Sequence, residues 1–322
     1  MTYTPNNRRR SLMKGLAALG LGTAGRFAVS ATAMESSVPN SAGSARPALA
    51  APPLACDSHI HIYSNEFPIL DPKATLPTQA TVEDYRKFQR RIGTTRAVVV
   101  QPANYRTDNR VTLDAIARLG AQNARGIAVL DPHVTNAELR QLHEGGIRGI
   151  RFSLFNPDHA VTRVDMIEPL ARRVSDLGWH IQLQMRADLI VANAAMLQAL
   201  PCPVVFDHMG RLPQPVLESE AYSSMRRMLD GGKTWIKASG AYLNTKLGPP
   251  GYDDATAVAQ SFIRAAPERV VWGSDWPHPT ERQLKPDDAL LFDLLLRWAP
   301  DEPIRHRILV DNPALLYGFP PI

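Results

Sequence analysis

The feature of this chain that most constrains its fold is a regular alternation of short apolar runs with helix-like stretches. Eight runs have the length of strands and lie at residues 55–62, 97–101, 126–130, 149–154, 180–184, 204–207, 234–238 and 270–273. Most are continuously apolar, which is typical of strands buried on both faces of a parallel sheet. The alternation predicts an α/β fold, a (β/α)8 TIM barrel, to which residues 286–319 add two helices as a C-terminal extension.

The stretches between the apolar runs carry the start and stop signals of helices. Thr81 is followed by Glu83 and Asp84, a pattern that favours a helix N-terminus because free N–H groups and the helix dipole attract oxygen acceptors and negative charge. Another helix is expected over residues 135–144, where a glycine pair ends it.

The first 33 residues have the three features of a twin-arginine signal peptide in the right order. Residues 9–14 read Arg-Arg-Ser-Leu-Met-Lys, residues 15–29 are weakly apolar, and residues 31–33 form a small-residue cleavage site. Residues 34–53 are rich in Ser, Ala and Pro, and we expect a disordered linker there, before a barrel domain at 54–322. The leader predicts export of the folded protein to a bacterial periplasm, and a basic, disordered N-terminus on a cytoplasmic protein is the alternative.

The charge of the chain does not favour a polyanion as partner. The formal net charge is +5, and the five Lys and Arg residues before residue 34 account for all of it. We therefore expect no nucleic acid partner and, since no other run is long and apolar enough, no membrane span. Cys56 and Cys202 precede predicted strands that are far apart in order, so we expect two free, buried thiols. The oligomeric state stays open.

One motif places chemistry at the start of the barrel, because His59 and His61 are two residues apart on a predicted strand. Side chains at i and i+2 of a strand share one face, so both imidazoles would point into one pocket. Packing histidines without chemistry are the alternative. Asp207, His208 and Asp275 also stand at the ends of apolar runs, where barrel enzymes carry their catalytic groups. We therefore expect one active site built from these strand ends.

Five motifs in one order resemble the amidohydrolase superfamily, in particular its branch around 2-pyrone-4,6-dicarboxylate lactonase, 4-sulfomuconolactone hydrolase and galactarolactone isomerase. The motifs lie at residues 57–61 (DSHIH), 100–109 (VQPANYRTDN), 146–152 (GIRGIRF), 204–211 (VVFDHMGR) and 272–278 (WGSDWPH). The resemblance covers residues 54–319. It implies an enzyme, a lactonase that hydrolyses a small anionic substrate, a carboxylated or sulfonated unsaturated lactone from aromatic breakdown.

The chemistry of lactone opening gives each site residue an expected role. Asp275 is the candidate general base for water, with a pKa that burial would raise, or else a structural carboxylate that caps the next turn. His208 would polarise the carbonyl or protonate the leaving oxygen, or else be a core histidine. His59 and His61 would polarise the carbonyl directly or, together with Asp275, hold one zinc ion that does so. The resemblance implies that pyrone lactonases work without a metal whereas related lactonases hold zinc, so both alternatives stay open.

Arginines are the candidate groups for the negative charge of the substrate. Arg151 and Arg211 would bind a carboxylate or sulfonate through paired N–H donors, and each is otherwise a surface salt-bridge residue. The further candidates for substrate contact are Tyr105, Gln184 and His278. The resemblance implies a second arginine shortly after the Arg151 position in pyrone dicarboxylate enzymes. Residues 153–159 contain none, which leaves the identity of the lactone open.

Three other functions stay open. A sugar-acid lactone isomerase would need the same His and Asp residues but would add no water overall. A metal-dependent decarboxylase is the other alternative, since the resemblance also includes enzymes with this activity. A non-catalytic binding protein would keep the barrel alone, and the intact set of site residues speaks against it. These residues are His59, His61, His208 and Asp275.

Overall fold

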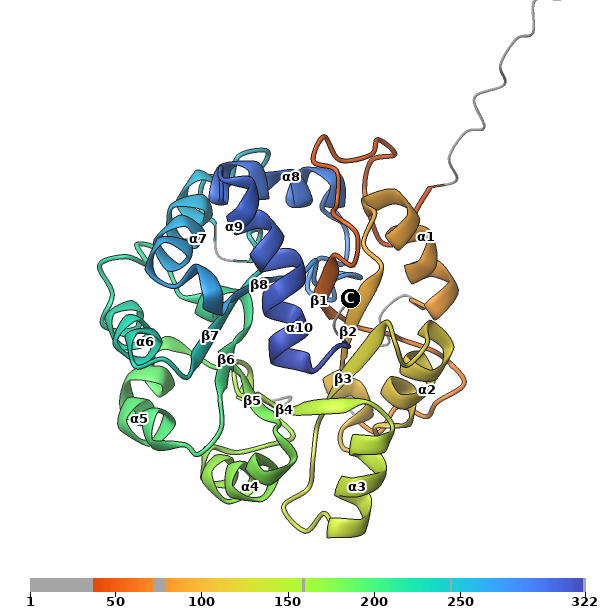
Figure 1. Ribbon diagram of the computed structural model, residues 1–322, viewed down its shortest axis with the longest axis vertical. Helices are drawn as coiled ribbons and strands as arrows, with labels where there is room; N and C mark the ends of the chain where they lie inside the picture. The colour runs from red at the N-terminus through yellow and green to blue at the C-terminus, as the bar shows by residue number, and fades with distance from the viewer. Residues whose placement is uncertain (1–36, 72–78, 158–159, 244, 321–322) are drawn as a thin grey trace, which may run out of the picture. The chain divides into compact units, whose positions relative to one another are not determined.

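An eight-stranded parallel sheet forms the centre of this computed structural model, which describes residues 37–71, 79–157, 160–243 and 245–320. The strands are β1 Cys56–Ile60, β2 Arg96–Val100, β3 Ala124–Ala128, β4 Ile147–Ser153, β5 His180–Gln184, β6 Val204–Phe206, β7 Thr234–Ala238 and β8 Val270–Trp272. They neighbour one another in chain order (Figure 1). Asp275 N donates to His59 O and His61 N donates to Trp276 O, both at 2.9 Å, which links the last strand to the first. The predicted (β/α)8 barrel is confirmed, with a nearly closed ring of strands.

Helices follow the strands around the barrel. They are α1 Val82–Ile92, α2 Arg110–Leu119, α3 Asn136–Glu144, α4 Ile167–Val174, α5 Ala187–Ala199, α6 Glu220–Asp230, α7 Asp253–Ala265, α8 Asp288–Trp298, α9 Glu302–His306 and α10 Asn312–Tyr317. The expected start of α1 is confirmed, since the Thr81 hydroxyl accepts from Asp84 N at 3.2 Å in a capping box. The C-terminal extension is confirmed, but its described part has three helices rather than two, because a π-helical turn at Arg307–Asp311 separates α9 from α10.

Helix α10 lies across one end of the barrel (Figure 1). The Tyr317 ring meets the His180 ring at 5.5 Å between centroids. The Phe319 ring lies against the guanidinium groups of Arg96 and Arg125, at 4.9 and 4.8 Å. These partners stand at the amino ends of their strands. The extension therefore covers the amino end of the barrel and leaves the carboxyl end for chemistry.

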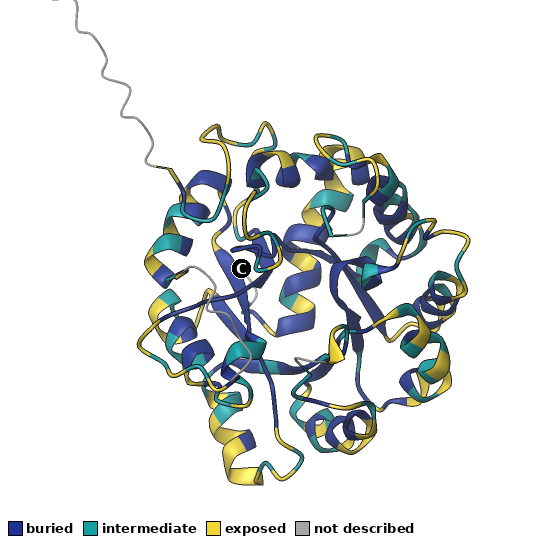
Figure 2. Cartoon of the chain, turned by 180° about the vertical axis from the view of Figure 1, so that it is seen from behind, coloured by how far each residue is buried: buried dark blue, intermediate teal, exposed yellow. Residues whose placement is uncertain are grey.

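Burial follows the layers of the barrel. The strands are almost wholly buried, whereas the helices bury the face toward the sheet and expose the other face (Figure 2). Burying one large aliphatic side chain contributes about 1.5–3 kcal/mol, so the apolar runs that identify the strands also stabilise them. Cys56 and Cys202 are free and buried, as expected. Within the described ranges, no helix is long and apolar enough to cross a membrane.

The segment before β1 differs from its prediction. Residues 37–53 form no regular helix or strand, yet they are tied to the barrel. Trp276 Nε1 donates to Pro39 O at 2.9 Å, and the buried Arg91 of α1 donates to Ala42 O at 2.8 Å. The prediction of a disordered linker is wrong for these residues, because side chains of the barrel satisfy backbone carbonyls that local composition leaves without partners. The predicted signal peptide, 1–33, and residues 34–36 lie outside the described residues, so the signal peptide stays a prediction.

Candidate active site

The His59 and His61 imidazoles meet at the carboxyl end of β1. His61 Nδ1 lies 2.8 Å from Val100 O, and a carbonyl only accepts, so we assign the proton to Nδ1 and leave a lone pair on Nε2. His59 Nδ1 lies 3.2 Å from the Asp207 carboxylate, which gives the same assignment. The two Nε2 atoms then face each other at 3.3 Å. The strand therefore brings both imidazoles together, as predicted, but only His61 lines the pocket described below.

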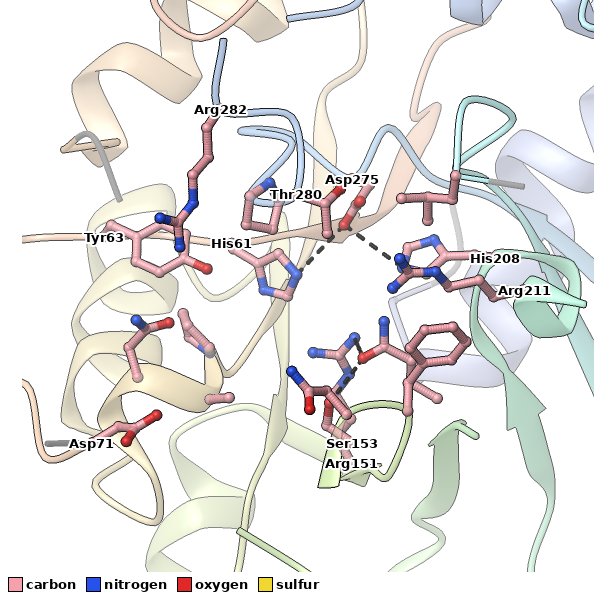
Figure 3. A pocket seen from close by; sticks show the side chains of 18 residues that line it. His61, Tyr63, Asp71, Arg151, Ser153, His208, Arg211, Asp275, Thr280 and Arg282 are labelled. Carbon is pink, nitrogen blue, oxygen red and sulfur yellow. Dashed lines mark hydrogen bonds and ion pairs between the residues drawn. The ribbon is translucent and has the colours of Figure 1, made fainter. Parts of the chain in front are cut away.

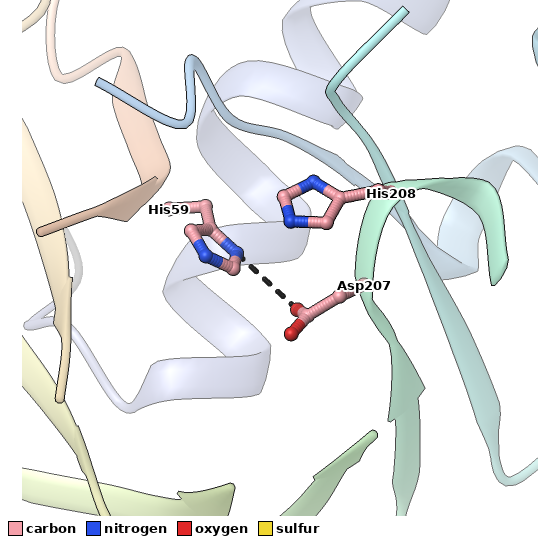
Figure 4. A group of neighbouring side chains, drawn as sticks. All are labelled: His59, Asp207 and His208. Atoms are coloured by element: carbon pink, nitrogen blue, oxygen red, sulfur yellow. Dashed lines mark ion pairs between the residues drawn. The ribbon is translucent and has the colours of Figure 1, made fainter. Parts of the chain in front are cut away.

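His208 joins them from the turn after β6. Residues 208, 209 and 211 have φ values of 51, 54 and 46°, in the left-handed region that L-residues seldom adopt. This turn directs His208 toward His59, with ring centroids 4.7 Å apart (Figure 4). Nδ1 of His208 lies 2.9 Å from Ser239 Oγ. Such backbone strain costs about 1–3 kcal/mol and is typical of functional sites.

Asp275 stands at the centre of the three imidazoles. Its Oδ1 lies 3.6, 3.5 and 3.8 Å from Nε2 of His59, His61 and His208, respectively. Its Oδ2 accepts from Tyr242 OH at 2.7 Å. Burial disfavours the carboxylate, whereas positive charge on the imidazoles, that of His208 first, holds the pKa of Asp275 well below its usual range. The expectation of a raised pKa is therefore wrong.

Asp207 supports this cluster from behind. It accepts from Arg151 Nε at 3.0 Å and from Gln182 Nε2 at 3.2 Å, and Lys237 Nζ lies 3.8 Å away. Burial opposes ionisation of Asp207, but His59 and these cations hold its pKa well below its usual range. From the sequence alone, Asp207 had no assigned role in catalysis. Its position beside His208, at the end of an apolar run, was the sequence signal that could have identified it as a supporting residue.

A pocket of about 250 Å³ opens over the cluster at the carboxyl end of the barrel (Figure 3). Its lining includes six of the predicted site residues, namely His61, His208, Asp275, Arg151, Gln184 and Arg211. The Arg211 guanidinium stacks on the Phe155 ring, 4.0 Å from its centroid. Arg151 donates from Nη2 to Gln184 Oε1 at 3.0 Å. The sequence therefore placed these residues together correctly, and their contact with substrate stays a prediction.

Three predicted site residues do not line this pocket. His59 is fully buried behind it, in contact with His61, Asp207 and Asp275. Tyr105 is 1% exposed, and its hydroxyl donates to Ser64 O and accepts from Ser64 N. His278 is 0% exposed and lies between Tyr242 and Asp288. The structure does not bring Tyr105 and His278 into the pocket wall, since other protein groups already occupy their polar atoms, and substrate contact by either stays a prediction.

The donor set fits a metal ion. His59, His61 and Asp275 form one group of possible ligands, and His59, Asp207 and His208 form another. We favour the first, because tetrahedral bonds of about 2.0–2.2 Å separate ligand atoms by about 3.3–3.6 Å, as observed here. Two imidazoles also have Nδ1 against a carbonyl or carboxylate, the arrangement that orients metal-binding histidines. Two lone pairs and a carboxylate at these distances require a cation, either a proton or a metal.

The fold and the site together define a barrel enzyme with a histidine–aspartate centre. The sequence profile of the family described as Amidohydrolase matches residues 56–319, and the chain belongs to this family. The predictions of this superfamily and of an enzyme are confirmed.

Named relatives place the chain within one branch. It is 34% identical over 286 residues to a 4-sulfomuconolactone hydrolase of Rhizobium radiobacter, covering 86% of this chain and 94% of that one. It is 33% identical over 287 residues to a 2-pyrone-4,6-dicarboxylate hydrolase of Comamonas testosteroni, with the same coverage. A crystal structure of a probable 2-pyrone-4,6-dicarboxylic acid hydrolase from Acinetobacter baumannii, with citric acid bound, matches with a TM-score of 0.71 at 28% identity. That match covers 83% of this chain and 100% of the other. The predicted branch is confirmed.

Proposed function

We propose that this enzyme opens an anionic unsaturated lactone by adding water, with 4-sulfomuconolactone and 2-pyrone-4,6-dicarboxylate as the candidate substrates. The observation that carries the proposal is the position of Asp275. One carboxylate oxygen meets three imidazoles at the floor of a pocket whose wall holds Arg151 and Arg211. The names of the relatives support lactone hydrolysis as the reaction.

Each described group has a place in the hydrolysis. Arg151 and Arg211 bind the carboxylate or sulfonate of the substrate, since guanidinium donors match both anions. A water oxygen adds to the lactone carbonyl carbon, and Asp275 accepts a proton from that water. The ring C–O bond then breaks, and the leaving oxygen takes a proton from His208. The product is the ring-opened acid. Where the carbon that held the ring oxygen also carries the sulfonate, the new hydroxyl loses its proton and becomes a carbonyl as the C–S bond breaks, which releases sulfite.

We further propose that the cation is one zinc ion, held by His59, His61 and Asp275. Bound zinc would polarise the carbonyl and lower the pKa of a water molecule. Metal analysis of the purified protein tests this, with about one zinc per chain expected. A metal-free protein of full activity would instead place protons on the imidazoles.

An ultraviolet assay of both lactones tests the reaction. We expect loss of the lactone absorbance for at least one lactone. The product of 2-pyrone-4,6-dicarboxylate should be heavier than the substrate by one water, and 4-sulfomuconolactone should give a desulfonated acid and one equivalent of sulfite. Asp275→Asn is expected to abolish turnover, because it removes the proton acceptor. Asp131→Asn, at an exposed position in the loop after β3, is expected to retain turnover. A rearranged lactone of unchanged mass would favour the isomerase, and released carbon dioxide the decarboxylase.

We also propose that residues 1–33 direct twin-arginine export to the periplasm. A fusion of residues 1–53 to a reporter protein tests this. We expect periplasmic reporter activity that disappears when Arg9 and Arg10 are both replaced by Lys. A reporter that remains in the cytoplasm in both cases would contradict export.

A further inference from the structure

A line of polar side chains continues from Asp275 away from the pocket. Tyr242 OH donates to Asp275 Oδ2 at 2.7 Å and lies 2.9 Å from His278 Nδ1. His278 Nε2 lies 3.0 Å from Asp288 Oδ2. His278 and Asp288 are 0 and 1% exposed, so burial shields this part of the line from solvent. The roles assigned to the substrate-binding and metal-binding groups leave all three residues beyond Asp275 unused.

The hydrogen bonds in this line have one direction. The Asp275 carboxylate only accepts, so the single hydroxyl proton of Tyr242 points to it. The Tyr242 oxygen must then accept from His278 Nδ1–H. The Tyr242 hydroxyl and His278 Nδ1–H therefore both donate toward Asp275, and neither group can turn without leaving a partner unsatisfied.

Three separate segments fix the geometry. Tyr242 lies in the loop after β7, and Asp288 begins α8. Asp275 and His278 share a tight turn in which His278 N donates to Asp275 O at 2.7 Å, and both have positive φ values, 63 and 55°. Lys285 Nζ donates to His278 O at 2.8 Å. A strained turn held from several sides indicates selection for position.

We propose that Tyr242, held by His278 and Asp288, is a positioning residue that fixes the rotation of the Asp275 carboxylate. With Oδ2 occupied by Tyr242, Oδ1 is the oxygen presented to the imidazoles and to the water. The expected effect of Tyr242 on the rate rests on the proposed hydrolysis. Its expected effect on the orientation of the Asp275 carboxylate does not. A displacement of about 1 Å in a catalytic group costs roughly 100-fold in rate.

Tyr242→Phe tests the proposal, since it removes one hydroxyl and keeps the ring. On the lactone that the wild type hydrolyses, we expect kcat to fall 10- to 100-fold with KM within threefold. His278→Gln is expected to lower kcat 3- to 10-fold and to add nothing to Tyr242→Phe, because both act through one hydroxyl. The control is Tyr222→Phe on α6, which removes a hydroxyl bonded to Ser261 away from the site and is expected to keep kcat unchanged.

A crystal structure of Tyr242→Phe gives the second readout, which needs no substrate. We expect the Asp275 carboxylate to rotate and Oδ1 to leave its position among the imidazoles. An unmoved carboxylate, or a kcat within threefold of the wild type, would overturn the positioning role. If the wild type hydrolyses neither lactone, the proposed function fails, and the position of Oδ1 alone decides the role of Tyr242.

Discussion

Replacing Asp207 with Asn should change the tautomer of His59, moving its proton from Nδ1 to Nε2. In the wild type, Asp207 Oδ2 accepts from Arg151 Nε and Gln182 Nε2, while Oδ1 faces His59 Nδ1 at 3.2 Å. An asparagine must turn its carbonyl oxygen to the two donors, which leaves its NH2 group facing His59. His59 Nδ1 must then accept, and the proton moves to Nε2, the atom that faces His61 and Asp275.

The size of the effect follows from the lost contact. A hydrogen bond to a charged group contributes about 1.5–3 kcal/mol. At 1.36 kcal/mol per tenfold change in rate, its loss lowers kcat about 10- to 160-fold. The buried Arg151 also loses its counter-charge, so we expect the free energy of unfolding to fall, by at most about 3–5 kcal/mol.

Kinetics and nitrogen NMR measure the two parts of this prediction. Steady-state assays should give the expected fall in kcat, and ¹⁵N spectra should show His59 protonated at Nε2 instead of Nδ1. Gln182→Met is the matched control, because it removes a donor to Asp207 without changing the His59 contact, and its kcat should stay within threefold. A folded Asp207→Asn protein with wild-type kcat and an unchanged His59 tautomer would refute the reasoning.

Three further changes have defined outcomes. Burial lowers the pKa of His180 from 6.5 to about 3, so the unfolded chain binds a proton at this residue before the folded chain does. The free energy of unfolding should therefore fall by up to about 1.4 kcal/mol for each pH unit below pH 6.5. Urea titrations at several pH values should show that the free energy of unfolding of His180→Leu depends less steeply on pH. Phe155→Leu removes the ring stacked on Arg211 and should raise KM up to about fivefold, at unchanged kcat, in the lactone assay. An unchanged KM would mean that this stacking does not contribute to substrate binding. Arg91→Met leaves Asp287 without its ion pair and removes the donor to Ala42 O, so the free energy of unfolding should fall by about 3 kcal/mol in urea titrations. A fall below about 0.5 kcal/mol, the size of a surface substitution, would mean that other contacts hold residues 37–53.

The sequence predicted the barrel because its strands carry their signal locally. Each strand is a short apolar run, and the carboxyl ends of parallel strands meet at one edge, so His61, His208 and Asp275 had to converge whatever the loops do. Arg151 and Gln184 reached the pocket for the same reason, since both stand near strand ends.

What the sequence could not supply were contacts between segments far apart in the chain. The roles of Tyr242 and Asp288 depend on a loop and a helix start that only the folded chain brings to Asp275. His278 follows Asp275 closely in sequence, but the turn directs it away from the pocket. The segment 37–53 lacks periodicity, and its order comes from partners such as Arg91 rather than from its own composition.

Turnover in water enriched in ¹⁸O tests the central claim most directly. The wild-type protein is incubated separately with 4-sulfomuconolactone and with 2-pyrone-4,6-dicarboxylate, and the mass of each product is measured by mass spectrometry. We predict one ¹⁸O atom in the new carboxylate for at least one lactone, and no product with Asp275→Asn. A product without ¹⁸O, or no turnover of either lactone, would contradict hydrolysis at this histidine–aspartate centre.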